Sequence, residues 1–377
     1  MKGMAEARVA ETAADDHRFM ARALQLAERG LFSTDPNPRV GCVLVRAGEV
    51  VGEGWHQRAG EPHAEIHALQ AAGAQARGAT AYITLEPCCH HGRTPPCSEA
   101  LMAAGVSRVV AAMEDPNPQV AGQGLARLQQ AGIDIHSGVL QAQAEALNPG
   151  FIQRMRHARP YVRGKMAMSL DGRTAMASGE SQWITGTAAR RDVHRLRARS
   201  AAILTGIGTV LADDPALTAR LEGDITQPLR VVLDSHLQLP LSARLLSSPG
   251  RSLILTVSDD THKADALRQA GAEVEVLAAR DGRVDLAAVL ACLARREVNE
   301  LMVEAGATLC GALLQEGLFD ELVIYMAPLV LGDAARGLLS LPGLASMADR
   351  IELQIDDMRA VGRDWRIQAR PVQKPTA

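Results

Sequence analysis

One histidine, one glutamate and two cysteines constrain the fold of this 377-residue chain more than any other residues. His63 precedes Glu65 by two positions, and Cys88 and Cys97 each follow a proline directly. One imidazole and two thiolates can hold a zinc ion with three protein ligands, which leaves the fourth position for water. An open position is typical of catalytic zinc sites, so we expect the fold to bring His63, Cys88 and Cys97 together.

Local sequence signals place these residues at the ends of regular elements. The pattern predicts that His63 begins a helix, that Cys88 ends a strand and that Cys97 begins another helix. A helix N-terminus carries partial positive charge, which favours a thiolate at Cys97. Glu65 should project from a different side of its helix than His63, so it can exchange protons with the water without binding the metal. Zinc-dependent deaminases of nucleobases use this layout of H-x-E and Pro-Cys.

The cysteine spacing leaves a second interpretation open. Eight residues separate Cys88 from Cys97, where the commoner deaminase pattern has two. Cys89, His90 and His91 are therefore rival ligands for a closed structural site with four protein ligands, although such a site gives the nearby glutamate no role. The polar loop at residues 90–94 either lines the substrate entrance and contacts a phosphate, or is simply solvated.

The composition excludes several protein classes. The formal net charge of −3 argues against sequence-independent nucleic-acid binding, which needs a large positive surface. The sequence shows no signal peptide and no apolar run long enough to span a membrane. Three of the six cysteines lie within ten residues, which fits a metal site in a reducing cytoplasm better than a disulfide framework. The other three lie in apolar strands or helices and should be buried small hydrophobic residues: Cys42, Cys292 and Cys310.

Strands and helices alternate along the whole chain, which predicts α/β domains with helical crossovers. The alternation breaks at residues 147–159, where we place the domain boundary. The expected organisation is a disordered tail at 1–14, a first domain at 15–150, a second domain at 151–370 and a disordered tail at 371–377. The first helix should begin at Asp15-Asp16 and end at Gly30. Further strands are expected at 40–45, 50–55, 79–85, 106–113, 133–136, 161–168, 201–205, 229–234, 253–257, 273–277, 300–304 and 322–331, and further helices at 63–73, 97–105, 124–131, 187–199, 263–270, 286–295 and 308–316.

Three further features have both a functional and a plain structural interpretation. Asn37 lies between two prolines and is either a rigid hydrogen-bonding group or part of a turn. Glycines follow strands at 206–208 and at Gly306, where a helix start could hold a phosphate, although neither stretch matches the dinucleotide-binding fingerprint. The basic stretch at 190–199, with Arg220 nearby, is either a solvated helix face or a phosphate site.

Taken together, these motifs resemble one family, the bifunctional deaminase–reductases of riboflavin biosynthesis. The resemblance covers residues 15 to 370 and accounts for the long spacing between the two cysteines, which is the form that this family uses. Residues 237–299 offer no matching motif. The matching segments are 36–41, 63–65, 84–97 and 115–118 in the first half, and Lys165, 169–172, 181–185, 211–215 and 303–306 in the second half.

The resemblance implies a fold and a reaction for each domain. The first domain should be a cytidine-deaminase-like α/β/α sandwich that binds zinc through His63, Cys88 and Cys97. It would remove the 2-amino group of a diaminopyrimidinone ribosyl phosphate by hydrolysis, with Glu65 as the catalytic proton carrier. The second domain should resemble dihydrofolate reductase and transfer a hydride from NADPH, reducing the ribosyl to a ribityl chain. Lys165 is expected to assist at the reductase centre.

The same resemblance implies which residues contact ligands. Those expected to contact NADPH are Ala167, Trp183, Thr209, Asp213, Ser235, Gly306, Ala307, Thr308, Leu309, Cys310, Gly311 and Ala312. Those expected to contact the substrate are Asn37, Ser181, Arg197, Leu217, Arg220 and Glu304. We also expect a homo-oligomer, either a dimer or a tetramer, located in the cytoplasm, with a small-molecule substrate and no nucleic-acid or membrane partner.

Two rival functions remain open from the sequence. One is a deaminase acting on RNA or nucleosides with a C-terminal binding domain, against which the low charge and the 3% aromatic content weigh. The other is a non-enzymatic zinc module that senses a metabolite, in which Glu65 would have no chemical role.

Overall fold

The computed structural model describes residues 2–89, 96–118, 120–223 and 225–372. The chain divides into two compact units, Met1–Ala158 and Arg159–Ala377, and the dividing point falls inside the window expected from the sequence. Each unit has its own sheet and its own hydrophobic cores.

The first unit is built on a sheet of five strands within the described residues, in the order β2-β1-β3-β4-β5. β1 is antiparallel to β2 and β3, whereas β3, β4 and β5 are parallel to one another. The parallel strands are joined by helices, as their connections require. The strands are β1 (Gly41–Arg46), β2 (Glu49–Trp55), β3 (Thr80–Ile83), β4 (Arg108–Ala111) and β5 (Asp134–Ser137).

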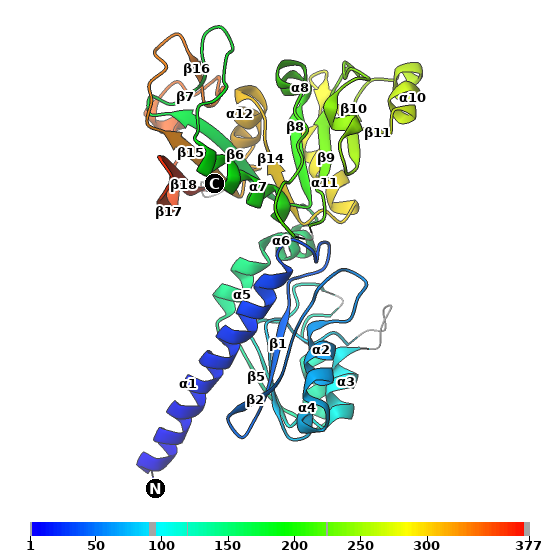
Figure 1. Cartoon of the computed structure of the whole chain (residues 1–377), viewed down its shortest axis with the longest axis vertical. Coiled ribbons are helices and arrows are strands. Elements are labelled where there is room, and N and C mark those ends of the chain that lie inside the picture. The colour runs from blue at the N-terminus through cyan, green and yellow to red at the C-terminus, as the bar shows by residue number, and fades with distance from the viewer. Residues whose placement is uncertain (1, 90–95, 119, 224, 373–377) are drawn as a thin grey trace. The chain divides into compact units, whose positions relative to one another are not determined.

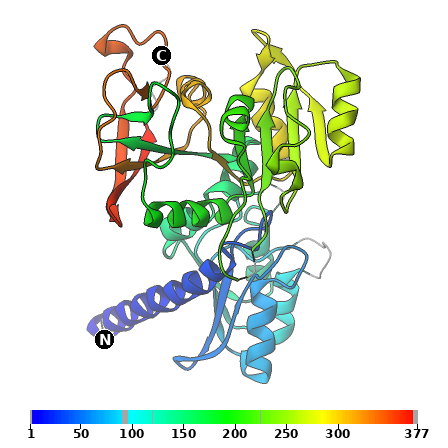
Figure 2. The ribbon, with the colours of Figure 1, turned by 45° about the horizontal axis from the view of Figure 1, so that its top comes forward.

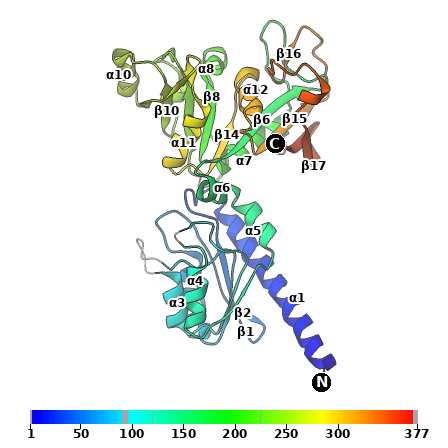
Figure 3. The same cartoon turned by 180° about the vertical axis from the view of Figure 1, so that it is seen from behind.

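Helices cover both faces of this sheet (Figures 1 and 3). Side chains alternate along β1, so Cys42 and Leu44 pack under α2, α3 and α4, while Val43 and Val45 pack against α1 and the α5–α6 pair. The result is the predicted α/β/α sandwich. The helices are α1 (Lys2–Ala27), α2 (Ala64–Ala72), α3 (Cys97–Ala104), α4 (Gln123–Gln130), α5 (Gln141–Leu147) and α6 (Pro149–His157), with short 3₁₀ turns at Glu28–Gly30 and Gly73–Ala76.

The N-terminal expectations differ from the structure. α1 begins at Lys2, so the predicted start at Asp15-Asp16 is wrong, and helix covers most of the stretch expected to be a disordered tail. Residues 4–14 contain alanine and other strong helix formers and no proline, so nothing there stops a helix. The helices α5 and α6 were not expected either; Pro149 occupies the first turn of α6, where its missing N–H costs nothing.

The second unit is built on a larger sheet, with nine strands in its described part. Its order is β11-β10-β9-β8-β14-β6-β15-β18-β17, and the strands from β11 to β15 are parallel. Figure 2 shows the two ends of this sheet by colour, yellow-green near β11 and red near β18. The strands are β6 (Tyr161–Ser169), β8 (Ala202–Gly206), β9 (Leu229–Leu233), β10 (Ser252–Thr256), β11 (Ala272–Val276), β14 (Glu300–Val303), β15 (Glu321–Ala327), β17 (Leu353–Val361) and β18 (Asp364–Pro371).

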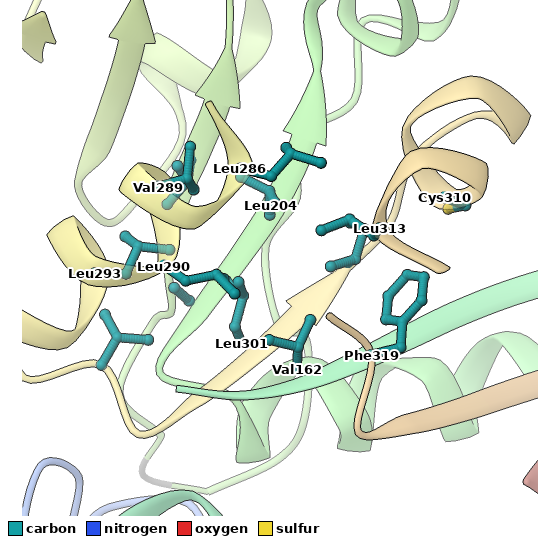
Figure 4. Packing of buried hydrophobic residues seen from close by; sticks show 14 of the residues in the cluster. Val162, Leu204, Leu286, Val289, Leu290, Leu293, Leu301, Cys310, Leu313 and Phe319 are labelled. Carbon is teal, nitrogen blue, oxygen red and sulfur yellow. The ribbon is translucent and has the colours of Figure 1, made fainter. Parts of the chain in front are cut away.

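Helices again cover both faces of the sheet. α11 and α12 pack on one face, where Leu290, Leu313 and Phe319 meet Val162 and Leu301 from the strands (Figure 4). α7, α8 and α10 supply side chains to the opposite face. The helices are α7 (Thr187–Arg199), α8 (Ile207–Asp213), α9 (Arg244–Ser247), α10 (Thr261–Gln269), α11 (Leu286–Arg295) and α12 (Ala307–Gln315), with a 3₁₀ turn at Met347–Asp349. Two small ladders pair β7 (Arg173–Ala175) with β16 (Arg336–Gly337), and β12 (Ala279–Arg280) with β13 (Arg283–Val284).

The C-terminal hairpin β17–β18 was not predicted. β17 is the edge strand and most of its side chains are exposed, so no clean alternation of buried and polar residues marks it in the sequence. The strand expected at 322–331 ends at Ala327 instead. The α/β class predicted for both units is confirmed.

Candidate active sites

The first candidate site lies where one strand and two helices of the first unit meet. His63 is the residue before α2 and Cys97 is the first residue of α3, as predicted. The prediction that Cys88 ends a strand is wrong, since β3 stops at Ile83 and Cys88 lies in the irregular segment that follows it. The Nδ1 atom of His63 is 3.7 Å from the Cys88 Sγ and 3.3 Å from the Cys97 Sγ. These three ligand atoms all lie within 4.8 Å of one another, a spacing that suits one tetrahedral metal ion.

Local packing explains why these residues converge. A Cβ atom on Gly54 would lie 2.3 Å from the Ala64 carbonyl oxygen, so α2 packs directly on the β2 backbone only because this residue is glycine. That contact sets the position of His63 at the start of α2. The Cys97 N–H donates to the Cys88 Sγ at 3.3 Å, so the start of α3 already favours a thiolate at Cys88.

The closed four-ligand alternative is not supported by the described residues. Cys89 lies next to Cys88 but does not join the group formed by His63, Cys88 and Cys97. The other rivals, His90 and His91, lie outside the described residues, as does the rest of the loop at 90–94. Among the described residues, the donor set is one nitrogen and two sulfurs, which is chemistry that suits zinc at a site with an open position.

Glu65 lies in α2, beside the three proposed ligands, and is 3% exposed. Within the described structure its Oε2 atom has no hydrogen-bond partner. A buried carboxylate oxygen without a partner is costly unless a ligand completes it. Burial raises the pKa of Glu65, although the neighbouring His63 opposes this effect. A carboxyl group with a raised pKa can both accept and return a proton near neutral pH.

The two thiols behave as a coupled pair. The hydrogen bond from Cys97 lowers the pKa of the Cys88 thiol to about 4, with a further contribution from His63. The same hydrogen bond, together with burial, raises the pKa of Cys97. A divalent cation that binds both sulfurs would favour the thiolate form of both cysteines.

Asn37 has a partner that the sequence did not reveal. Its Nδ2 atom lies 3.0 Å from the Nε2 atom of His56, whose Nδ1 atom lies 3.2 Å from the Pro62 carbonyl oxygen. Because that carbonyl can only accept, the proton sits on Nδ1 and the Asn37 amide donates to Nε2. The His56 ring also packs edge-on against His63, with 5.4 Å between the ring centroids. The sequence held one signal for this contact, a histidine directly after the strand expected at 50–55.

The second candidate site lies at the carboxyl edge of the parallel strands in the second unit. The strands β6, β14, β8 and β9 are adjacent and parallel, so the residues that follow them meet at one edge, where α/β sheets bind their ligands. Glu304 follows β14, Gly206 ends β8, and Ser235 lies two residues after β9. Gly306 precedes α12, and a Cβ atom there would meet nothing within 4 Å, so the backbone borders open space.

Three charged side chains meet at this edge. Arg197 from α7 donates from Nε and Nη2 to the two carboxylate oxygens of Glu304, at 2.5 and 2.9 Å. The Lys165 Nζ lies 3.7 Å from the Glu304 Oε2. Burial favours the protonated form of Glu304, but the two cations outweigh it and lower its pKa to about 2. The carboxylate therefore stays ionised and fixes both cations.

The other predicted ligand residues of the second unit take varied positions. Ala167 lies on β6 near Lys165, and Thr209 and Asp213 lie on α8. Trp183 is 66% exposed and its ring is 4.7 Å from the Arg190 guanidinium. The Cys310 side chain is buried. A Cβ atom on Gly311 would lie 1.9 Å from the Ser340 carbonyl oxygen, so the Gly311 backbone packs closely against that segment. Ala307, Thr308, Leu309 and Ala312 belong to α12, Leu217 is buried, Ser181 is half-buried and Arg220 is exposed.

Comparisons with known proteins identify both domains. A model of the cytidine and deoxycytidylate deaminase zinc-binding region matches residues 13–113, and a model of the RibD C-terminal domain matches residues 160–367. Riboflavin biosynthesis protein RibD of Escherichia coli K12 is 54% identical over 362 residues, which cover 93% of this chain and 97% of that protein. The chain belongs to the RibD family of riboflavin biosynthesis proteins.

Solved structures of this family have the same fold over nearly the whole chain. Acinetobacter baumannii RibD is 44% identical with a TM-score of 0.90, over 96% of this chain and 100% of that chain. A Thermotoga maritima structure is 32% identical with a TM-score of 0.85 at the same coverage, and its name gives both a deaminase and a reductase activity. The present chain is thus a bifunctional enzyme of riboflavin biosynthesis with a zinc-binding deaminase domain and a reductase domain. In its described part, no helix is long and apolar enough to cross a membrane.

The charge cluster at Glu304 should make the second unit sensitive to acid. The folded pKa of about 2 lies below the ordinary value of 4.5, so the stabilisation is complete above pH 4.5 and is lost as the pH falls toward 2. Glu304→Gln should therefore destabilise the unit by about 3 kcal/mol at pH 7, because it removes the carboxylate shared by two half-buried cations.

Hydrogen exchange of the β14 amides, measured from pH 7 to pH 4, checks this expectation. The difference between wild type and Glu304→Gln should be largest at pH 7 and should narrow below pH 4.5. The matched control is Glu316→Gln, because Glu316 forms an exposed pair with Arg280 at 3.4 Å and should contribute less than about 1 kcal/mol. Equal effects of the two substitutions would contradict the role given to the Glu304 cluster.

Proposed function

We propose that the first unit hydrolyses the 2-amino group of 2,5-diamino-6-ribosylamino-4(3H)-pyrimidinone 5′-phosphate. The second unit then reduces the ribosyl to a ribityl chain with NADPH, giving 5-amino-6-ribitylaminouracil 5′-phosphate. One observation carries the proposal most strongly: the ligand atoms of His63, Cys88 and Cys97 lie within 4.8 Å of one another beside the buried Glu65.

In the deaminase, His63, Cys88 and Cys97 would hold the zinc ion. When bound, zinc lowers the pKa of a water at its open position toward neutrality. Glu65 would accept the two protons that a water molecule loses as its oxygen replaces the 2-amino group at C2, and would pass one to the ring nitrogen and one to the departing ammonia. Asn37 uses its Nδ2 for His56, so its Oδ1 is the atom that would accept a hydrogen bond from the substrate.

In the reductase, the open backbone at Gly306, the start of α12 and Ser235 fit a dinucleotide phosphate and ribose. NADPH supplies a hydride when bound. The cofactor would be surrounded by Ala167, Trp183, Thr209, Asp213 and the α12 residues up to Ala312. Cys310 and Gly311 would contact it through their backbone. Lys165 would protonate or orient the substrate nitrogen at the reacting carbon. The substrate phosphate and sugar would be bound by Arg197, Glu304, Arg220, Leu217 and Ser181.

A coupled assay tests this proposal directly. Ammonia release and NADPH oxidation are measured with the diaminopyrimidine phosphate as substrate, and zinc is measured on the same sample. The proposal predicts about one zinc per chain and both activities. Protein that binds tRNA but leaves NADPH unoxidised would instead favour a deaminase acting on RNA.

We also propose a homo-oligomer, either a dimer or a tetramer, located in the cytoplasm. Members of the matched family act on small molecules in a biosynthetic pathway, which suits this location. Light scattering of the purified full chain measures the oligomeric state, and a monomeric mass at working concentration would refute that part of the proposal.

A further inference from the structure

Glu86 is a buried carboxylate that the deaminase mechanism does not use. It lies two residues before Cys88 and is 3% exposed. Its Oε2 accepts hydrogen bonds from the backbone N–H groups of Asp115 at 3.0 Å and Gly122 at 2.9 Å. Its Oε1 accepts from those of Gly124 at 2.8 Å and Leu125 at 3.2 Å. Two carboxylate oxygens offer about four acceptor sites, so this side chain is fully satisfied by backbone N–H groups alone.

These hydrogen bonds hold residues near the start of α4 against the segment after β3 that carries Cys88. All four donors belong to residues 115–125, which include the segment before α4 and its first turn. The contact continues through the backbone, because a Cβ atom on Gly124 would lie 2.1 Å from the Pro87 carbonyl oxygen. Glu86 and Gly124 therefore fix the backbone on the N-terminal side of Cys88.

A second connection from α4 reaches both cysteine segments. Arg127 donates from Nη1 to the Cys89 carbonyl oxygen at 3.2 Å, on the C-terminal side of Cys88. It also donates from Nη2 to the Glu99 Oε1 at 2.9 Å, and Glu99 lies in the first turn of α3, which Cys97 begins. α4 thus contacts the chain before Cys88, the chain after it and the helix of Cys97.

We infer that Glu86 is a positioning residue for the metal site. Arg127 is a second, more exposed positioning residue for the same site. The buried Glu86 carboxylate holds the start of α4 against the backbone before Cys88. This contact sets the separation of the Cys88 and Cys97 sulfurs. Residues that orient metal ligands without touching the metal commonly change its affinity about 10- to 100-fold when they are replaced. The inference rests on the proposed ligands His63, Cys88 and Cys97.

Zinc affinity of the full chain, measured by chelator competition at fixed pH, tests the inference. Glu86→Gln places an amide NH₂ against backbone N–H donors, so its zinc Kd should rise about 10- to 100-fold. Arg127→Met removes an exposed side chain and should fold normally, with a Kd raised about 3- to 10-fold. Arg46→Met, an exposed control on β1, should leave the Kd unchanged.

Two further variants separate positioning from stability and from ligation. Val110→Ala removes a buried β4 side chain on the opposite face of the sheet, in the core formed with α1, α5 and α6, so it should lower the unfolding temperature and keep the wild-type Kd. Cys88→Ser should lose zinc, and retention of zinc there would overturn the ligand assignment rather than the role of Glu86. If Glu86→Gln fails to fold, Arg127→Met decides alone. A wild-type zinc Kd in Arg127→Met would overturn the inference. So would a loss of zinc affinity in Val110→Ala as large as that in Glu86→Gln.

Discussion

Glu65→Gln should lower the rate of ammonia release by about 10³-fold while the chain keeps its zinc. Glutamine matches the volume of glutamate but cannot accept a proton from water and return it. The site is sensitive to this loss because Glu65 is buried, has a raised pKa and lies beside all three proposed ligands. The measurement is steady-state ammonia release with zinc content determined on the same preparation.

The control is Glu49→Gln, the same substitution at an exposed position on β2, which should leave ammonia release and zinc content unchanged. Ammonia release within tenfold of wild type in Glu65→Gln would show that another group carries the proton. Loss of zinc in Glu65→Gln would show that this residue supports the metal rather than the proton transfer.

Lys165→Met should lower NADPH oxidation by about 10²- to 10³-fold and leave ammonia release unchanged. Methionine keeps an unbranched apolar stem but removes the ammonium group, which lies 3.7 Å from the Glu304 Oε2 at the carboxyl edge of the sheet. Without it, the substrate nitrogen at the carbon that receives the hydride loses the group proposed to protonate or orient it. NADPH oxidation is followed with substrate that has already been deaminated.

Two comparisons make this result specific to the reductase site. NADPH affinity, measured by its fluorescence, should change little, since Lys165 is proposed to act on the substrate. Lys263→Met on α10 serves as the matched control and should oxidise NADPH at the wild-type rate. A Lys165→Met enzyme with at least one third of wild-type activity would refute the role given to this lysine.

Two of the three metal ligands were predictable because their signals are local. His63 and Cys97 stand at helix starts, and Pro96 directly precedes the second helix. The place of Cys88 was predicted less well, because β3 ends at Ile83 rather than at the cysteine.

In the second unit, the sequence indicated only that Gly306 follows a strand and precedes a helix. The strand order that brings Glu304 and Gly306 to one edge with Gly206 was not predicted.

The supporting residues were not predictable, because their roles depend on contacts between distant segments. Glu86 bonds to Leu125, 39 positions along the chain, and His56 bonds to Asn37, 19 positions back. Neither pairing leaves a periodic trace in the sequence. The exposed β17 strand escaped prediction for a related reason, since hydrophobic alternation marks only strands with one buried face.

The central claim is that this chain carries two separate active sites, one for each reaction. The most direct test supplies Glu65→Gln with substrate that has already been deaminated and measures NADPH oxidation. We predict the wild-type rate of NADPH oxidation in a variant that no longer releases ammonia from the diaminopyrimidine phosphate. Loss of both activities together, in a protein that is folded and retains zinc, would contradict the division into two sites.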